Sequence, residues 1–118
     1  MKGIVIEGLK GASGLGFPTA NIKVNPKDSH PSGVYAGLVE VLDGSHTGTY
    51  LATIHIDDNF KHEAEAHLLN FSGDLYGSTI SILIKDRIRD CKFPCKSKQE
   101  FKDRLSLDCK QVKAILNK

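Results

Sequence analysis

Short segments rich in apolar residues, separated by turn-forming residues, make up the first two-thirds of the chain and predict strands. Asp43-Gly44 lies between two of these segments, and both residues tolerate the positive φ of a tight hairpin turn. Residues 25–33 hold two prolines, an aspartate and a glycine, which is typical of a surface loop. The predicted strands are 4–6, 19–24, 34–42, 47–56, 63–71 and 79–88.

The hydrophobic period changes after Pro94, from that of a strand to that of a helix. Residues 97–100 read Ser-Lys-Gln-Glu and fit a capping box. The apolar positions that then recur at helical spacing are Phe101, Leu105, Cys109, Val112 and Leu116. Six strands and one helix predict a mainly β fold, a closed antiparallel barrel with the helix packed outside. Closure removes exposed strand edges, which helps so small a chain.

Length and charge narrow the class of protein. A chain of 118 residues has room for one domain, residues 1–118, and an apolar content of 40% suits a globular protein. Sixteen basic and fourteen acidic residues give a net charge of +2, too little for a dedicated nucleic-acid surface. No apolar run is long enough to span a membrane, and no signal-peptide pattern begins the chain, so we expect a cytoplasmic protein. Three cysteines, an odd number, argue against a disulfide framework.

A glycine-rich loop precedes the second predicted strand. Gly8, Gly11 and Gly14 would let backbone N–H groups approach a ligand, and Thr19 and Asn21 offer oxygen atoms to a cation. Magnesium takes a few oxygen ligands and leaves its other positions to water and phosphates. The segment therefore fits a cradle for phosphate and magnesium, although the same residues are ordinary in turns. It contains neither a Walker A loop nor a dinucleotide-binding fingerprint.

Acidic residues recur on one face of the fifth predicted strand. Side chains alternate along a strand, so Glu63, Glu65 and His67 share a face. This face is either a solvated outer surface or the source of a general base for phosphoryl transfer to an alcohol. Periodicity alone does not choose between Glu63 and Glu65.

These two blocks, in this order, resemble the sequences of riboflavin kinases, which phosphorylate riboflavin to FMN. In that family a glutamate is followed two residues later by His or Tyr, then by an aliphatic pair, a short turn and Tyr-Gly. The matching segments of this chain are 16–21, 33–37, 65–77 and 88–93. The resemblance implies a six-stranded antiparallel Greek-key barrel with a C-terminal α-helix, and it covers nearly the whole chain. No room is left for a fused adenylyltransferase, so a monofunctional kinase is expected.

The resemblance also implies site residues. Glu65 would be the catalytic base, taking the proton of the ribityl 5′-hydroxyl as it attacks the γ-phosphate of ATP. Thr19 and Asn21 would bind Mg²⁺, and His67 would be a structural residue of its strand. The expected nucleotide-binding residues are Lys10, Gly14, Gly16, Thr19 and Asn21. Arg89 and Phe93 are expected beside the flavin, although a surface cation is the alternative for Arg89, as it is for Lys10. The three oxygen-bearing side chains are expected to meet around one metal ion at the mouth of the barrel.

Two segments depart from the family pattern. The loop at residues 10–14 is short and has no arginine, and residues 56–61 lack the Pro-Thr of the usual flap. Excluding water from the site favours phosphoryl transfer to the substrate over hydrolysis of the nucleotide. A shorter flap is therefore expected to affect catalytic efficiency. A catalytically silent barrel that binds flavin or nucleotide is therefore one alternative. A small barrel that binds RNA or a protein through the lysines at 92, 96, 98 and 102 is another. The favoured prediction is a monomer whose partners are riboflavin and ATP.

Overall fold

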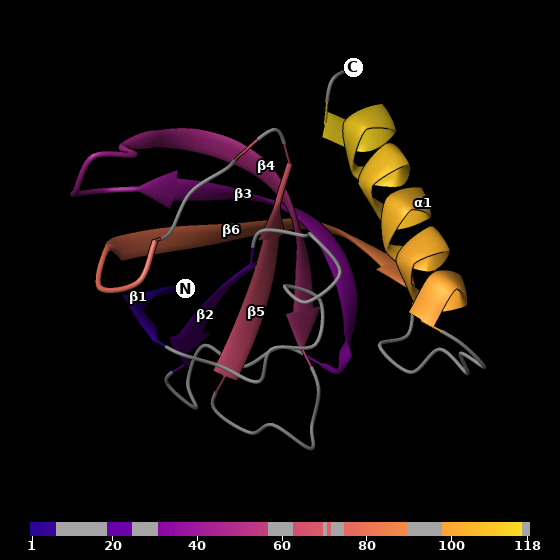
Figure 1. Ribbon diagram of the computed structural model, residues 1–118, viewed down its shortest axis with the longest axis horizontal. Coiled ribbons are helices and arrows are strands. Elements are labelled where there is room, and N and C mark those ends of the chain that lie inside the picture. Colours follow the sequence, from indigo (N-terminus) through magenta and orange to yellow (C-terminus); the bar gives the residue numbers. More distant parts are fainter. Residues whose placement is uncertain are drawn as a thin grey trace.

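The computed structural model describes residues 1–6, 19–24, 31–56, 63–69, 71, 75–89 and 98–116; at residues 19, 98, 101 and 105 it describes the backbone alone. These residues form six strands and one helix (Figure 1). The elements are β1 (Lys2–Ile6), β2 (Thr19–Lys23), β3 (Gly33–Val41), β4 (Gly48–Ile56), β5 (Glu63–Leu68), β6 (Thr79–Arg89) and α1 (Lys98–Leu116).

The strands close into a barrel in the order β1-β2-β5-β4-β3-β6, and every pairing is antiparallel. β3, β4 and β5 pair in chain order, and β6 returns to pair with β3, which is the Greek-key arrangement. The barrel closes where Lys2 and Ile4 of β1 pair with Ser81 and Thr79 of β6. The predicted six-stranded Greek-key barrel with a C-terminal helix is confirmed.

The hairpin predicted around Asp43-Gly44 joins β3 to β4. The connection runs over residues 42–47, and Gly44 has a φ of +83°, the left-handed conformation that glycine adopts without strain. The Asp43 carboxylate accepts a hydrogen bond of 2.9 Å from the backbone N–H of Thr79. This bond ties the hairpin to the first residue of β6.

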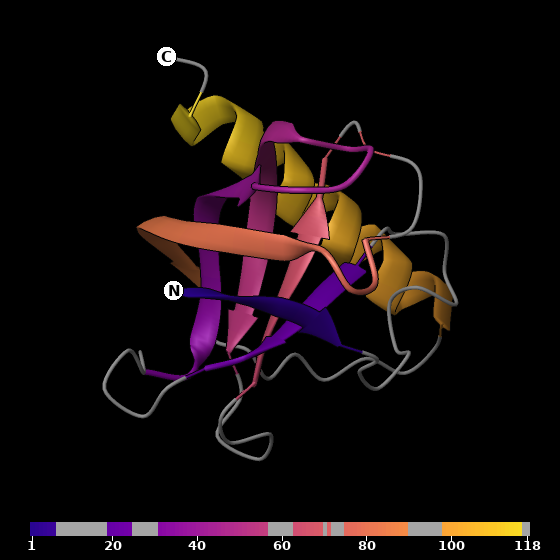
Figure 2. The ribbon, with the colours of Figure 1, turned by 90° about the vertical axis from the view of Figure 1, so that its left-hand side faces the viewer.

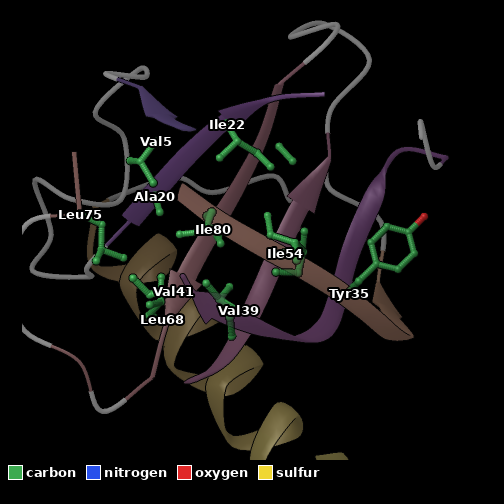
Figure 3. Packing of buried hydrophobic residues seen from close by; sticks show 14 residues of the cluster. Val5, Ala20, Ile22, Tyr35, Val39, Val41, Ile54, Leu68, Leu75 and Ile80 are labelled. Atoms are coloured by element: carbon green, nitrogen blue, oxygen red, sulfur yellow. The ribbon is translucent and has the colours of Figure 1, made fainter. Parts of the chain in front are cut away.

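Alternate strand residues point into the barrel and fill it with apolar side chains (Figure 3). Between β2 and β5, Ala20 lies opposite Ala66 and Ile22 opposite Ala64, and none of the four is more than 1% exposed. Burying an aliphatic side chain as large as isoleucine contributes roughly 1.5–3 kcal/mol. Because these positions face inward, the residues between them on β2 and β5 face outward.

The fifth strand ends earlier than its pattern predicts. The pattern of residues 63–71 predicts strand throughout, but β5 ends at Leu68. The ring of Phe71 packs edge-on against the rings of His46 and Tyr50, each with a centroid distance of 5.1 Å. Phe71 therefore belongs to an aromatic cluster beside the β3–β4 hairpin, and its hydrophobicity indicates burial rather than strand.

Helix α1 lies outside the barrel, against β3, β4 and β6 (Figure 2). Val112 is completely buried and packs with Ala36 and Leu69 in a second apolar cluster. Cys109 and Leu116 also contact this cluster, as the helical stripe predicts. Within the described residues, no helix combines the length and the apolar character needed to cross a membrane.

β3 and β6 approach closely at Gly37. A Cβ atom at this position would lie 2.6 Å from the carbonyl oxygen of Leu83, nearer than real Cβ atoms come to another atom. The pairing of β3 with β6 is irregular between Ala36 and Gly37, as in a β-bulge. Only glycine allows this approach without a backbone shift.

Candidate active site

The outward face of β2, β5 and β4 carries a row of three polar residues. Asn21 of β2 pairs with Glu65 of β5, and Glu65 pairs with His55 of β4. The amide Nδ2 of Asn21 lies 3.4 Å from the carboxylate Oε2 of Glu65, a long hydrogen bond. Asn21 is 9% exposed, whereas the Glu65 side chain is 25% exposed. The carboxylate therefore reaches solvent while its amide neighbour is almost buried.

A second row lies beside the first. Thr19 of β2 pairs with His67 of β5, and His67 pairs with Thr53 of β4. Thr19 is two residues from Asn21 on the same strand, so both positions are on the outward face. The structure thus places Thr19, Asn21 and Glu65 at adjoining positions of one face. That face is the outer wall of the barrel rather than its mouth, because core residues occupy the inward positions of both strands.

Register distinguishes the two glutamates that periodicity leaves equivalent. Glu63 pairs with Lys23, at the end of β2, whereas Glu65 pairs with Asn21. A lysine opposite Glu63 is an ordinary cross-strand neighbour of opposite charge. Glu65 is therefore the glutamate beside the predicted metal ligands.

A pair of histidines adjoins Glu65. Nε2 of His67 contacts Oε1 of Glu65, and the ring of His67 stacks on that of His55 with a centroid distance of 4.1 Å and an interplanar angle of 24°. Nε2 of His55 lies 3.3 Å from Oγ1 of Thr53. Burial lowers the pKa of His55 well below its ordinary value of 6.5, and the nearby His67 and Arg89 lower it further. His55 is therefore neutral at neutral pH.

Sequence reasoning gave His67 only a structural role and missed His55. A histidine at alternate spacing from Thr53 is an unremarkable residue of a polar strand face. The one signal that brings His55 to Glu65 is the pairing of β4 with β5, which the sequence pattern does not specify.

Arg89, a predicted flavin contact, lies at the end of β6 and binds α1. Its Nε is 3.0 Å and its Nη2 is 2.8 Å from the two carboxylate oxygens of Asp108. Arg104 also contacts Asp108, at 3.2 Å, and Asp108 is completely buried. A carboxylate held by two guanidinium groups anchors the helix to the barrel. The flavin role of Arg89 stays a prediction.

The other predicted ligand-binding residues lie outside the described residues. They are Lys10, Gly14, Gly16 and Phe93. The trimmed flap at residues 57–61 is outside them too, as are two of the three cysteines. The third, Cys109, lies on α1 and packs against the second apolar cluster, and burial, with a smaller effect of the Asp108 charge, raises the pKa of its thiol. A raised pKa disfavours the reactive thiolate, in keeping with a structural cysteine.

The donor set on this face suits a magnesium ion that is only partly held by protein. Amide and carboxylate oxygens, here those of Asn21 and Glu65, are hard ligands of the kind that Mg²⁺ prefers. Among the described residues no group of three His, Cys, Asp or Glu side chains can enclose a metal. Mg²⁺ in phosphoryl transfer enzymes commonly keeps few protein ligands and takes the rest from phosphate and water, so the residues fit such a site.

Comparison with known proteins gives a consistent result. The family model described as "Flavokinase: Riboflavin kinase" matches residues 1–116. A bifunctional riboflavin kinase/FMN adenylyltransferase of Haemophilus influenzae is 32% identical over 121 residues, covering 98% of this chain and 38% of that protein. The chain thus spans well under half the length of such curated relatives.

Solved structures of other proteins share the fold. A riboflavin kinase from Trypanosoma brucei matches with a TM-score of 0.74 and 26% identity, covering 99% of this chain and 76% of that chain. A Streptococcus pneumoniae structure described as a macrolide-efflux protein matches with a TM-score of 0.79 and 29% identity, covering 95% and 37%. Each similarity extends over almost all of the chain.

Proposed function

Because the chain belongs to the riboflavin kinase family, we propose that it transfers the γ-phosphate of ATP to the 5′-hydroxyl of riboflavin, giving ADP and FMN. The observation that carries this proposal is the juxtaposition of Asn21 and Glu65 across β2 and β5. The Asn21 amide faces the partly exposed carboxylate with Nδ2, so its oxygen is available as a cation ligand next to a proton acceptor. Phosphoryl transfer to an alcohol requires both.

Glu65 is the proposed catalytic base. Its carboxylate takes the proton of the ribityl 5′-hydroxyl while that oxygen forms a bond to the γ-phosphorus and the bond to the leaving ADP oxygen breaks. The exposed quarter of the side chain supports this role, because a substrate hydroxyl has to reach the carboxylate. The contacts with Asn21 and His67 hold the carboxylate in place on this face.

Thr19 and Asn21 are the proposed protein ligands of Mg²⁺. When bound, the ion neutralises charge on the transferring phosphates. Asn21 is held in a paired strand and is almost buried, which fixes its amide for this purpose. The loop residues Lys10, Gly14 and Gly16 are proposed to contact the nucleotide, and Arg89 and Phe93 to border the flavin. A monomeric, cytoplasmic enzyme remains our expectation from the sequence.

The direct test is product formation. The purified chain is incubated with riboflavin, ATP and MgCl₂, and the flavins are separated by chromatography with fluorescence detection. We expect FMN to accumulate in proportion to time and protein, and to disappear when ATP is omitted or EDTA is in excess over the metal. Riboflavin that binds but is never converted would contradict the proposal and favour the silent flavin-binding barrel.

A further inference from the structure

The Glu65 carboxylate is held from two sides. Oε1 contacts Nε2 of His67 on the same strand, and Oε2 faces the Asn21 amide at 3.4 Å on the neighbouring strand. An ionised carboxylate only accepts hydrogen bonds, so the His67 tautomer that fits this contact carries its proton on Nε2. The two oxygens are therefore distinguished, one by an imidazole and the other by an amide.

His67 is itself held firmly. The residue is 2% exposed, although it lies on the outward face of the barrel. Its ring stacks on His55, and His55 in turn contacts the hydroxyl of Thr53. A buried imidazole is costly unless it makes hydrogen bonds, and the contact with Glu65 is one that offsets this cost.

We propose that His67 is a positioning residue for phosphoryl transfer: its Nε2–H fixes Oε1 of Glu65 and leaves Oε2 as the oxygen that receives the substrate proton. The inference rests on the proposed kinase function, and it assigns His67 a part in turnover rather than in strand structure alone. A glutamate side chain has three rotatable bonds, and misplacing a catalytic group by about 1 Å costs roughly 100-fold in rate. Holding one oxygen removes that freedom.

Two substitutions separate the ring from the donor. His67→Phe keeps an aromatic ring against His55 and removes the N–H, whereas His67→Gln removes the ring and keeps an N–H at a similar reach. We expect His67→Phe to lower kcat about 10- to 100-fold with both KM values within about threefold of the unaltered chain. His67→Gln should recover at least about tenfold in kcat relative to His67→Phe.

The opposite ranking would overturn the inference. If His67 only supports the strand, the phenylalanine variant, which preserves the stacked ring, keeps kcat and the glutamine variant loses stability. Unfolding midpoints and riboflavin binding are measured for both variants so that a misfolded chain is recognised. Failure of the unaltered chain to form FMN would instead overturn the proposed function itself.

A spectroscopic measurement tests the contact without turnover. The ¹⁵N imidazole resonances of His67 are recorded in the unaltered chain, in Glu65→Gln and in Glu63→Gln. We expect the Nε2 resonance to move in Glu65→Gln and to stay in place in Glu63→Gln, whose side chain lies opposite Lys23. An Nε2 resonance that is the same in all three proteins would overturn the inference even where the phenylalanine variant cannot be purified.

Discussion

Glu63 and Glu65 lie on the same face of β5 and differ in what stands opposite them. Glu65→Gln removes the proposed proton acceptor while keeping the shape of the side chain. We expect kcat to fall by about two to four orders of magnitude with riboflavin binding retained. The measurement is steady-state FMN formation combined with a fluorescence titration of riboflavin.

Glu63→Gln is the matched control. Its register partner is Lys23 rather than Asn21, so the substitution removes a charge that does not adjoin the proposed metal ligands. We expect kcat within about twofold of the unaltered chain. Equal losses in the two variants would contradict the assignment of Glu65 as the base.

His55 makes the stability of the fold dependent on pH. Its pKa in the folded chain lies well below 6.5, so on acidification the unfolded chain takes up the proton first. The free energy of unfolding therefore falls as the pH drops from 6.5 toward the pKa of the folded state, by at most about 1.4 kcal/mol per pH unit for this group. Urea unfolding at pH 7.5, 6.5 and 5.5 measures the slope.

His55→Gln is the comparison for this slope. Glutamine has no proton to gain in this range, so the variant should lose less stability between pH 6.5 and 5.5 than the unaltered chain does. If the free energy of unfolding depends on pH equally in the variant and the unaltered chain, the pKa of His55 is not lowered in the folded state.

Single residues also show where sequence reasoning stops. The alternation of strand side chains places Glu63 and Glu65 together, but the choice between them depends on which residues of β2 they face. His55 had no recognisable signal, since its neighbours His67 and Glu65 belong to another strand. Local pattern identifies a face, whereas the pairing of distant strands identifies a site.

At the level of elements, the docking of α1 depends on a buried charge cluster. Asp108 is completely buried between Arg89 of β6 and Arg104 of the helix. Asp108→Asn removes the negative charge and leaves two guanidinium groups together, and breaking a buried ion pair costs about 3–5 kcal/mol. We expect a loss of about 3 kcal/mol in the free energy of unfolding, measured with urea.

Asp103→Asn is the same substitution on the same helix. Asp103 is exposed and accepts a hydrogen bond of 2.9 Å from Gln99. We expect its effect to stay within about 0.5 kcal/mol. Comparable losses in the two variants would show that the buried cluster does not anchor the helix.

For the helix, its existence depends on neighbouring residues, whereas its position against the barrel depends on a contact between distant ones. Its apolar period predicts a helix after residue 97, and α1 spans Lys98–Leu116. The ion pair that fixes its position joins residues 19 apart, one of them on a strand, and no periodic pattern links them. The predicted strand ends likewise agree with the observed ones to within three residues. The largest difference is the early end of β5, which depends on how Phe71 packs against the hairpin.

For the whole molecule, ligand binding should be visible as added stability. A ligand present at 100 times its Kd stabilises the folded chain by about 2.7 kcal/mol, which for a domain of this size raises Tm by roughly 10 °C. We expect riboflavin, Mg²⁺ and ADP added together to raise Tm more than riboflavin alone does, and more than Mg²⁺ with ADP does. Thermal unfolding followed by circular dichroism measures the shift.

Removing the metal provides the control. With EDTA in excess, the share of the shift that is due to ADP should be largely lost, because the proposed ligands on β2 bind the nucleotide through the cation. An ADP effect that is unchanged by EDTA would contradict a metal site at Thr19 and Asn21.

The number of strands could be predicted from the sequence pattern, but their order in the barrel could not. The number of strands and the closed barrel follow from strand segments in a chain that is too small to leave edges exposed. The order β1-β2-β5-β4-β3-β6 does not follow from periodicity, and the Greek-key expectation came from the resemblance to riboflavin kinases. Segment patterns are local, whereas strand order is a property of contacts between distant residues.

The pairing of β2 with β5 has a consequence for how the protein matures. The two residues that it brings together, Asn21 and Glu65, are 44 positions apart, and the amino group of Met1 reaches Ile82 to help close the barrel. The β3–β4 hairpin can assemble early from neighbouring residues, but a loop of that size must be closed before the amide meets the carboxylate. During synthesis or refolding, the proposed active site would therefore form only in the last step, when the barrel closes.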